Sequence, residues 1–326
     1  MFVNVSMLGK EKTYDTAARP VTVLNAVEDL APEYKNTALG CFCGGRALEL
    51  NRVLGEDCAL HPITFRNEEG RRIYERTLRF VLLMAVERVM GDACHVRIEH
   101  SIGHGVYMRF LDREADAETV EKLDGEMRRI VSENLSFTKE KWSRDEAIHY
   151  FSLRGMKEKA HLLAFRPYDY FNIYRCGGMA EYFYGAMLPS TGYVSTFKLL
   201  YHKPGMVLQM PSVANPCFPA PYEERKKNLA VFAQSNQWLD ILDCSNAADL
   251  NEMTVGGKLR EFIRINEALH DKSIADIADG IAQKGARAVF VAGPSSSGKT
   301  TFSNRLCIHL RVLGKKPVLI SLDDFY

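Results

Sequence analysis

The chain has 326 residues, of which 46% are hydrophobic and 25% charged, and its formal net charge is +1 at pH 7. This length predicts two or three domains, each able to bury a core, and the near-neutral charge excludes a global attraction to nucleic acid, though not a local basic patch. No apolar stretch approaches the roughly 18 residues of a membrane span, and the N-terminus lacks the charged start of a signal peptide, so we expect a cytoplasmic protein without a membrane anchor.

Residues 1–62 combine short strands with one helix. Phe2 begins an apolar run that predicts a strand, Val21–Leu30 places apolar residues on one helical face, and Asn36–Cys43 predicts a returning strand that ends in a Gly-Gly turn. This pattern is typical of a small α+β module of the β-grasp type.

Residues 63–212 are interpreted as a second α+β domain. Arg71–Met90 is a strong amphipathic helix, and further helices are predicted over Ala117–Leu135 and from Ser143 onward. The remaining apolar runs predict strands at His95–Ile98, Val106–Phe110, Asn172–Arg175 and Val194–Tyr201.

Residues 213–285 are interpreted as a helical connector. Five prolines between positions 204 and 221 mark the boundary before it. Helical patterns then follow at Glu223–Leu242, Asp249–Met253, Lys258–His270 and Ile274–Gln283.

Residues 286–326 predict the start of an α/β domain. The apolar run Ala288–Ala292 has the composition of a buried parallel strand, Thr301–Leu313 has a helical apolar face, and Lys316–Ser321 predicts a second strand. The whole chain is therefore expected to be a multidomain protein of α+β and α/β parts.

The eight cysteines and nine histidines are dispersed along the chain. Cys41 and Cys43 have a C-x-C spacing that suits neither a zinc knuckle nor a redox pair, so reduced thiols are the favoured reading. His100 and His104 have H-x-x-x-H spacing, but the glycines beside His104 argue against a helix that would place both on one face. A metal site there is the less favoured alternative.

The loop between the first strand and the helix of residues 286–326 reads Gly-Pro-Ser-Ser-Ser-Gly-Lys-Thr and fits the Walker A phosphate loop. Main-chain N–H groups and the helix N-terminus would bind phosphate, Lys299 would reach the β- and γ-phosphates, and Thr300 would bind Mg²⁺. A Gly/Ser turn with a solvated lysine is the alternative. The predicted ATP-binding residues are Gly293, Pro294, Ser295, Ser296, Ser297, Gly298, Lys299, Thr300 and Thr301.

Asp323 and Asp324 follow the second predicted strand, at the edge where open α/β sheets bind ligands. A carboxylate there can accept a hydroxyl proton or order a metal, and a pair of solvated loop aspartates is the alternative. With the Walker A loop, the segment Ile320–Tyr326 resembles the uridine kinase and phosphoribulokinase group of P-loop kinases. That resemblance implies that Asp323 is catalytic together with Lys299, and that Asp323 and Tyr326 bind the nucleoside substrate.

The chain departs from that kinase group because it stops at Tyr326. The group's lid arginines, base-binding elements and remaining strands would follow this position. We therefore expect an incomplete form that binds nucleotide weakly and does not turn it over.

A second resemblance covers residues 1 to about 200, which are similar to the N-terminal half of threonyl-tRNA synthetase. The residues that carry it are Gly105–Phe110, Ile173–Gly178, Leu188–Tyr193 and Phe197–Leu199. It implies that the first module is TGS-like and that the second resembles the synthetase editing domain.

The editing site of that synthetase uses an H-x-x-x-H and a C-x-x-x-H pair, and this chain has neither. The aligned positions hold Arg76 and Phe80 in the first pair, and Phe183 and Met187 in the second. Phenylalanine and methionine cannot supply the His and Cys donors of such a site, so we expect no zinc and no deacylase activity. Arg76 and its neighbouring arginines are expected to form a solvated basic face, with an anion contact as the alternative.

The order of the parts resembles a bacterial group of uridine or nucleoside kinases with synthetase-like N-terminal domains. The resemblance implies ATP-dependent phosphoryl transfer to a nucleoside hydroxyl, with ATP and Mg²⁺ as cofactors. The alternative is a module that binds RNA or a partner protein, or that regulates, with a nucleotide-responsive P-loop. Editing of mischarged tRNA is a third reading, which the missing ligands weaken.

Overall fold

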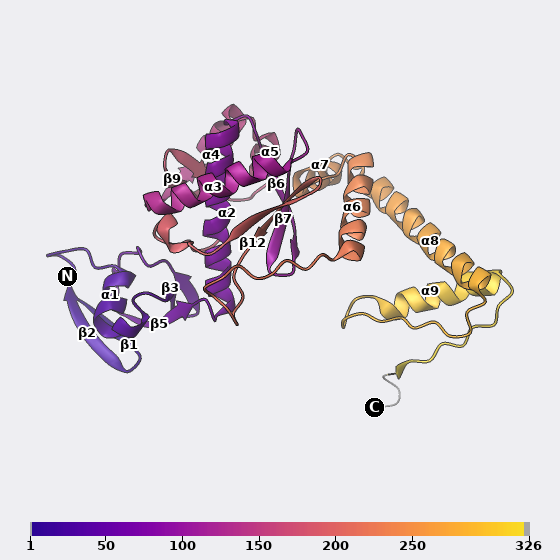
Figure 1. Cartoon of the computed structure of the whole chain (residues 1–326), viewed down its shortest axis with the longest axis horizontal. Helices are drawn as coiled ribbons and strands as arrows, with labels where there is room; N and C mark the ends of the chain where they lie inside the picture. Colours follow the sequence, from indigo (N-terminus) through magenta and orange to yellow (C-terminus); the bar gives the residue numbers. More distant parts are fainter. Residues whose placement is uncertain (1, 323–326) are drawn as a thin grey trace. The chain divides into compact units, whose positions relative to one another are not determined.

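The computed structural model describes residues 2–322 of the chain (Figure 1). Its strands form three separate sheets, and the chain divides into two compact units, Met1–Ala233 and Gln234–Tyr326. The expected multidomain α+β organisation is confirmed. The finer boundaries at residues 62, 212 and 285 stay predictions.

The first sheet has the strand order β2-β1-β5-β3-β4, in which β1 and β5 are parallel and the other pairs antiparallel. Helix α1 (Val23–Leu30) packs on it, and Thr22 and Asn25 cap the helix reciprocally. The prediction began this helix at Val21, but the helix begins at Val23 because Thr22 is its N-cap. The strands are β1 (Phe2–Met7), β2 (Lys10–Asp15), β3 (Ala38–Cys43), β4 (Arg46–Leu48) and β5 (Cys58–Thr64).

The second sheet is antiparallel, with the order β11-β12-β7-β6. Helices α2 (Glu68–Met90) and α3 (Ala117–Glu133) share one large hydrophobic core with this sheet, and they confirm two predicted helices. The opposite face carries a smaller apolar cluster around Tyr107. The strands are β6 (Val96–Ile102), β7 (Gly105–Phe110), β11 (Lys198–His202) and β12 (Gly205–Gln209).

The predicted strand at Val194–Tyr201 was wrong in its first half. A short helical turn, η2 (Thr191–Tyr193), precedes it, and β11 begins only at Lys198. Val194 and Phe197 are buried in the large core, so their apolar character reflects packing and not strand alternation.

The third sheet has the order β10-β9-β8 and was only partly predicted. Strand β9 (Tyr170–Cys176) contains the predicted segment, whereas β8 (Thr138–Ser143) and β10 (Met179–Glu181) were not expected. Two helices pack on this sheet around Phe151 and Phe171, and Ser143 and Glu146 form the capping box of the first. These helices are α4 (Arg144–Leu153) and α5 (Lys157–Ala164).

Helices dominate the last third of the chain. The predicted helices Lys258–His270 and Ile274–Gln283 are one continuous helix, α8, because the residues between them include no helix breaker. Ile274, Ala278, Leu306 and Leu310 form a small core between α8 and α9. The helices are α6 (Lys226–Ile241), α7 (Ala247–Val255), α8 (Leu259–Lys284) and α9 (Lys299–Val312).

The two strands predicted on either side of α9 are not formed in the described part of the chain. Ala288–Ala292 and Lys316–Ser321 carry no strand pairing, and Phe290 and Val318 are 91% and 82% exposed. A buried parallel strand depends on neighbouring strands and on layers covering both faces. Neither run has such neighbours between residues 286 and 322, so the α/β expectation is not met there.

No helix between residues 2 and 322 is long and apolar enough to cross a membrane.

Candidate functional sites: the phosphate loop and the synthetase-like site

The Walker A segment forms a loop that ends at the N-terminus of α9. Gly298, the N-cap of α9, has φ +83°, and Ser296 has φ +60°, so two residues adopt the left-handed conformation. The N–H of Ser297 donates to the carbonyl of Pro294 at 3.3 Å, and the first helical bond joins Phe302 N–H to the Gly298 carbonyl at 2.9 Å. The N–H groups of the first helical turn therefore have no acceptor within the helix, as an anion site requires.

Lys299 folds back across this loop. Its Nζ donates to the carbonyl oxygens of Gly293 and Pro294, at 2.9 Å and 2.8 Å. A Cβ on Gly293 would come within 2.8 Å of Ser297 Oγ, so the absence of a side chain there lets the loop close. The ammonium is thus held against two main-chain carbonyls of the loop.

The other predicted ATP-binding residues lie on the same surface. Gly293–Gly298, Thr300 and Thr301 are exposed, and Lys299 is half-buried. Asp323 and Tyr326 lie outside the described residues. The assignments of these side chains to phosphate, metal and nucleoside remain predictions.

A second site lies where the synthetase resemblance places its editing residues, and a guanidinium fills it. Arg76 on α2 donates from Nη1 to the carbonyl of Ala186 at 2.9 Å, and both of its Nη atoms lie 3.1 Å from Glu69 Oε1. Gly185 has φ +111°, and a Cβ there would stand 2.6 Å from Arg76 Cζ. Arg76 therefore occupies the space beside Gly185 and joins α2 to the loop at residues 183–188.

The other three aligned positions are filled by apolar packing. The ring of Phe80 lies 6.1 Å from that of Phe183 and 5.1 Å from that of Phe137. Met187 is buried, and Phe183 packs against the same core. The side chains at these positions pack in or against the hydrophobic core and supply none of the His and Cys donors of the synthetase editing site.

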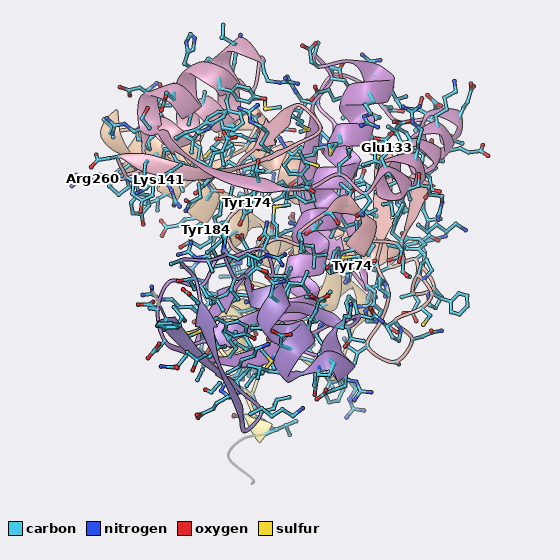
Figure 2. The ribbon with its side chains drawn as sticks, turned by 90° about the vertical axis from the view of Figure 1, so that its left-hand side faces the viewer. Tyr74, Glu133, Lys141, Tyr174, Tyr184 and Arg260 are labelled. Atoms are coloured by element: carbon cyan, nitrogen blue, oxygen red, sulfur yellow. The ribbon has the colours of Figure 1, made fainter. Side chains whose placement is uncertain are left out.

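A buried polar network lies next to this loop. The hydroxyl of Tyr174 contacts the carboxylate of Glu49 and lies 2.5 Å from the carbonyl of Gly185, and Lys139 Nζ lies 3.1 Å from Glu49 Oε1. Burial, reinforced by the negative charge of Glu49, raises the pKa of Tyr174, so its phenol stays neutral. Figure 2 labels Tyr174, which lies in β9, and Tyr184, an exposed residue of the loop at residues 183–188. Sequence reasoning missed this network because Glu49 lies 90 residues from Lys139 and 125 residues from Tyr174 in the chain.

The expected basic face on α2 is paired with acidic and carbonyl oxygens. Arg72 lies 2.6 Å from Glu68, and Arg79 contacts Glu75. Arg71 donates to the carbonyls of the loop that precedes α2. This pairing favours the structural interpretation of the arginines over an anion contact.

Between residues 2 and 322, no three His, Cys, Asp or Glu side chains gather closely enough to hold a metal ion. His100 instead stacks on Phe232, with ring centroids 3.9 Å apart. All eight cysteines are free thiols.

Comparison with known proteins gives one consistent relationship. The chain is 32% identical over 182 residues to the threonine–tRNA ligase of Symbiobacterium thermophilum, 30% over 183 residues to that of Ehrlichia canis, and 31% over 195 residues to that of Thermotoga petrophila. More than half of this chain is similar to part of a threonine–tRNA ligase. The matches cover 55%, 56% and 59% of this chain but only 28–29% of each ligase.

No protein-family profile matches the chain. The comparisons support the synthetase-like resemblance and do not extend it to an activity. They provide no test of the kinase interpretation, which rests on the phosphate loop.

Proposed function

We propose that the protein is an ATP-dependent kinase that phosphorylates a hydroxyl of a nucleoside. The observation that carries the proposal is the Walker A loop, with left-handed residues at Ser296 and Gly298 and a helix N-terminus at its end. A helix N-terminus offers free main-chain N–H groups that suit an anion, and Lys299 Nζ lies 2.9 Å from the Gly293 carbonyl of the same loop.

Each predicted residue has one role in this proposal. The loop N–H groups and Lys299 hold the phosphates, and Thr300 offers its hydroxyl to Mg²⁺, which neutralises phosphate charge when bound. Asp323 accepts the proton of the nucleoside hydroxyl while the hydroxyl oxygen forms a bond to the γ-phosphorus of ATP. The bond between the γ-phosphorus and the bridging oxygen breaks at the same time, which releases ADP.

The test is phosphoryl transfer from ATP by the protein, with uridine and the other common nucleosides offered as acceptors. We expect ADP and a nucleoside monophosphate in equal amounts, and loss of both in Lys299→Ala. Asp323→Asn should lower the turnover number while nucleotide binding persists, because the aspartate acts on the acceptor. Lys315→Ala, an exposed lysine after α9, is the matched control and should keep full activity. Unchanged turnover in Lys299→Ala would sink the assignment.

A second candidate function is RNA binding by the Met1–Ala233 unit. Lys141 Nζ lies 3.7 Å above the ring of Tyr170, the guanidinium of Arg166 lies 5.4 Å from the ring of Tyr168, and Tyr184 is 80% exposed (Figure 2). Exposed aromatic rings beside cations suit the stacking of single-stranded bases. These features favour RNA over a protein partner.

Filter binding with tRNA at two salt concentrations tests this candidate. Phosphate contacts give a steep salt dependence, and Lys141→Ala should weaken binding at low salt more than Lys10→Ala, an exposed lysine on β2. Failure to bind RNA even at low salt removes the candidate.

A further inference from the structure

The start of α6 docks on the outer face of the β11-β12-β7-β6 sheet through one ring stack. Phe232 of α6 lies over His100 of β6, with ring centroids 3.9 Å apart and an interplanar angle of 13°. Leu229, one turn earlier, packs on the apolar cluster of this face. No residue of α6 is fully buried, and Phe232 itself is 39% exposed, so the contact area is small.

The imidazole of His100 is placed where a positive charge is poorly accommodated. Its side chain is 12% exposed, and Nε2 is buried without a hydrogen-bond partner in the described part of the chain. Burial lowers the pKa of His100. A protonated ring would carry an N–H on both nitrogens, and the one on Nε2 would have no hydrogen-bond acceptor among the described residues.

Charged and titratable groups surround the ring on each packed element. On its own strand, Glu99 Oε2 lies 4.0 Å from Nδ1 and favours protonation, but the same carboxylate also contacts Arg109 of β7. Tyr107 of β7 lies 5.2 Å away, centroid to centroid. On the α6 side, Arg225 lines a cavity of about 50 Å³ together with His100 and Phe232.

We propose that His100 is a pH-dependent latch for the start of α6. The docked state prefers the neutral ring, because burial depresses its pKa relative to the undocked state. Docking is therefore complete at pH values above the ordinary histidine range and weakens as the pH falls through it. The released segment is the one through which the chain leaves the Met1–Ala233 unit and continues into the unit that carries the phosphate loop.

Hydrogen exchange of the amides in residues 226–232, measured between about pH 5.5 and 8 and corrected for intrinsic rates, tests the latch. In the wild-type chain we expect a several-fold loss of protection at the lower pH. His100→Phe keeps an aromatic ring that cannot be protonated and should hold its protection across the range. His104→Phe alters an exposed histidine in the adjoining turn and should behave as wild type.

Two results would overturn the proposal. One is a wild-type segment whose protection does not change with pH, and the other is the same pH dependence in His100→Phe. Phe232→Ala provides a check that does not depend on the histidine. It should lower protection at both ends of the pH range, and full protection in that variant would show that the ring stack does not hold α6.

Discussion

Arg76 provides a cross-link between α2 and the loop at residues 183–188. Its hydrogen bonds to Glu69 and to the Ala186 carbonyl are partly shielded, since the side chain is 17% exposed. Arg76→Met would remove the donor to Glu69 Oε1 and to the Ala186 carbonyl, while Arg72 Nη1 would remain 3.7 Å from Glu69 Oε2. We expect a loss of about 2 kcal/mol in the free energy of unfolding, which corresponds to a melting temperature lower by about 4–8 °C.

Thermal melting followed by circular dichroism measures this loss. The matched control is Arg72→Met on the same helix, whose side chain is 59% exposed and whose ion pair with Glu68 lies on the surface. Such a pair contributes at most about 1 kcal/mol. Equal melting shifts in the two variants would show that Arg76 is only another surface cation.

Gly185 and Arg76 should be energetically coupled. Gly185→Ala introduces a Cβ 2.6 Å from the guanidinium and forces alanine to a φ of +111°, so it should destabilise the wild-type chain. In the Arg76→Met background the clash is relieved and only the backbone strain remains. A double-mutant cycle should give a coupling of at least about 0.5 kcal/mol, whereas additive effects would contradict the placement of the guanidinium.

At the residue level, the sequence predicted what the synthetase-like site lacks but not what fills it. The loss of donors at Phe183 and Met187 could be predicted by alignment alone. The pairing of Arg76 with Ala186, 110 residues away, depends on tertiary structure. The same holds for the network of Tyr174, Glu49 and Lys139, since charged residues at such separations carry no local signal.

Among the elements, α9 carries the phosphate loop and depends on α8 for its core. Leu306 is 4% exposed and packs between the two helices. Leu306→Ala should cost about 2–4 kcal/mol and accelerate hydrogen exchange along α9. Ile308→Ala, at a position 58% exposed on the same helix, should change exchange little. Equal exchange in the two variants would mean that α8 does not support the loop's helix.

Helices were predicted better than strands, for a physical reason. The 3.6-residue pattern of α2 is local, so the sequence alone predicted this helix, and the helix predicted from Ser143 onward is α4, which begins at Arg144. Strand β8 is polar and pairs with β9, and this pairing cannot be predicted from the local sequence pattern of β8. The runs at Ala288–Ala292 and Lys316–Ser321 have strand composition but no strand partners in the described residues.

At the scale of the whole molecule, the synthetase-like site and the phosphate loop lie in different units. The Met1–Ala233 unit holds all three sheets and the residues that fill the synthetase-like site. The Gln234–Tyr326 unit holds the phosphate loop, on which the proposed activity depends. The chain matches only 28–29% of the length of these threonine–tRNA ligases, so the ligase activity is not assigned to it. The function must therefore be tested at the loop.

Titration calorimetry of this chain with ATP and Mg²⁺ tests the central claim most directly. We predict saturable binding that requires Mg²⁺ and is lost in Lys299→Ala, because the lysine acts with the loop N–H groups in holding the phosphates. Lys315→Ala should bind as the wild-type chain does. Absence of binding in the wild-type chain, or equal binding in Lys299→Ala, would contradict the assignment of this loop as a nucleotide site.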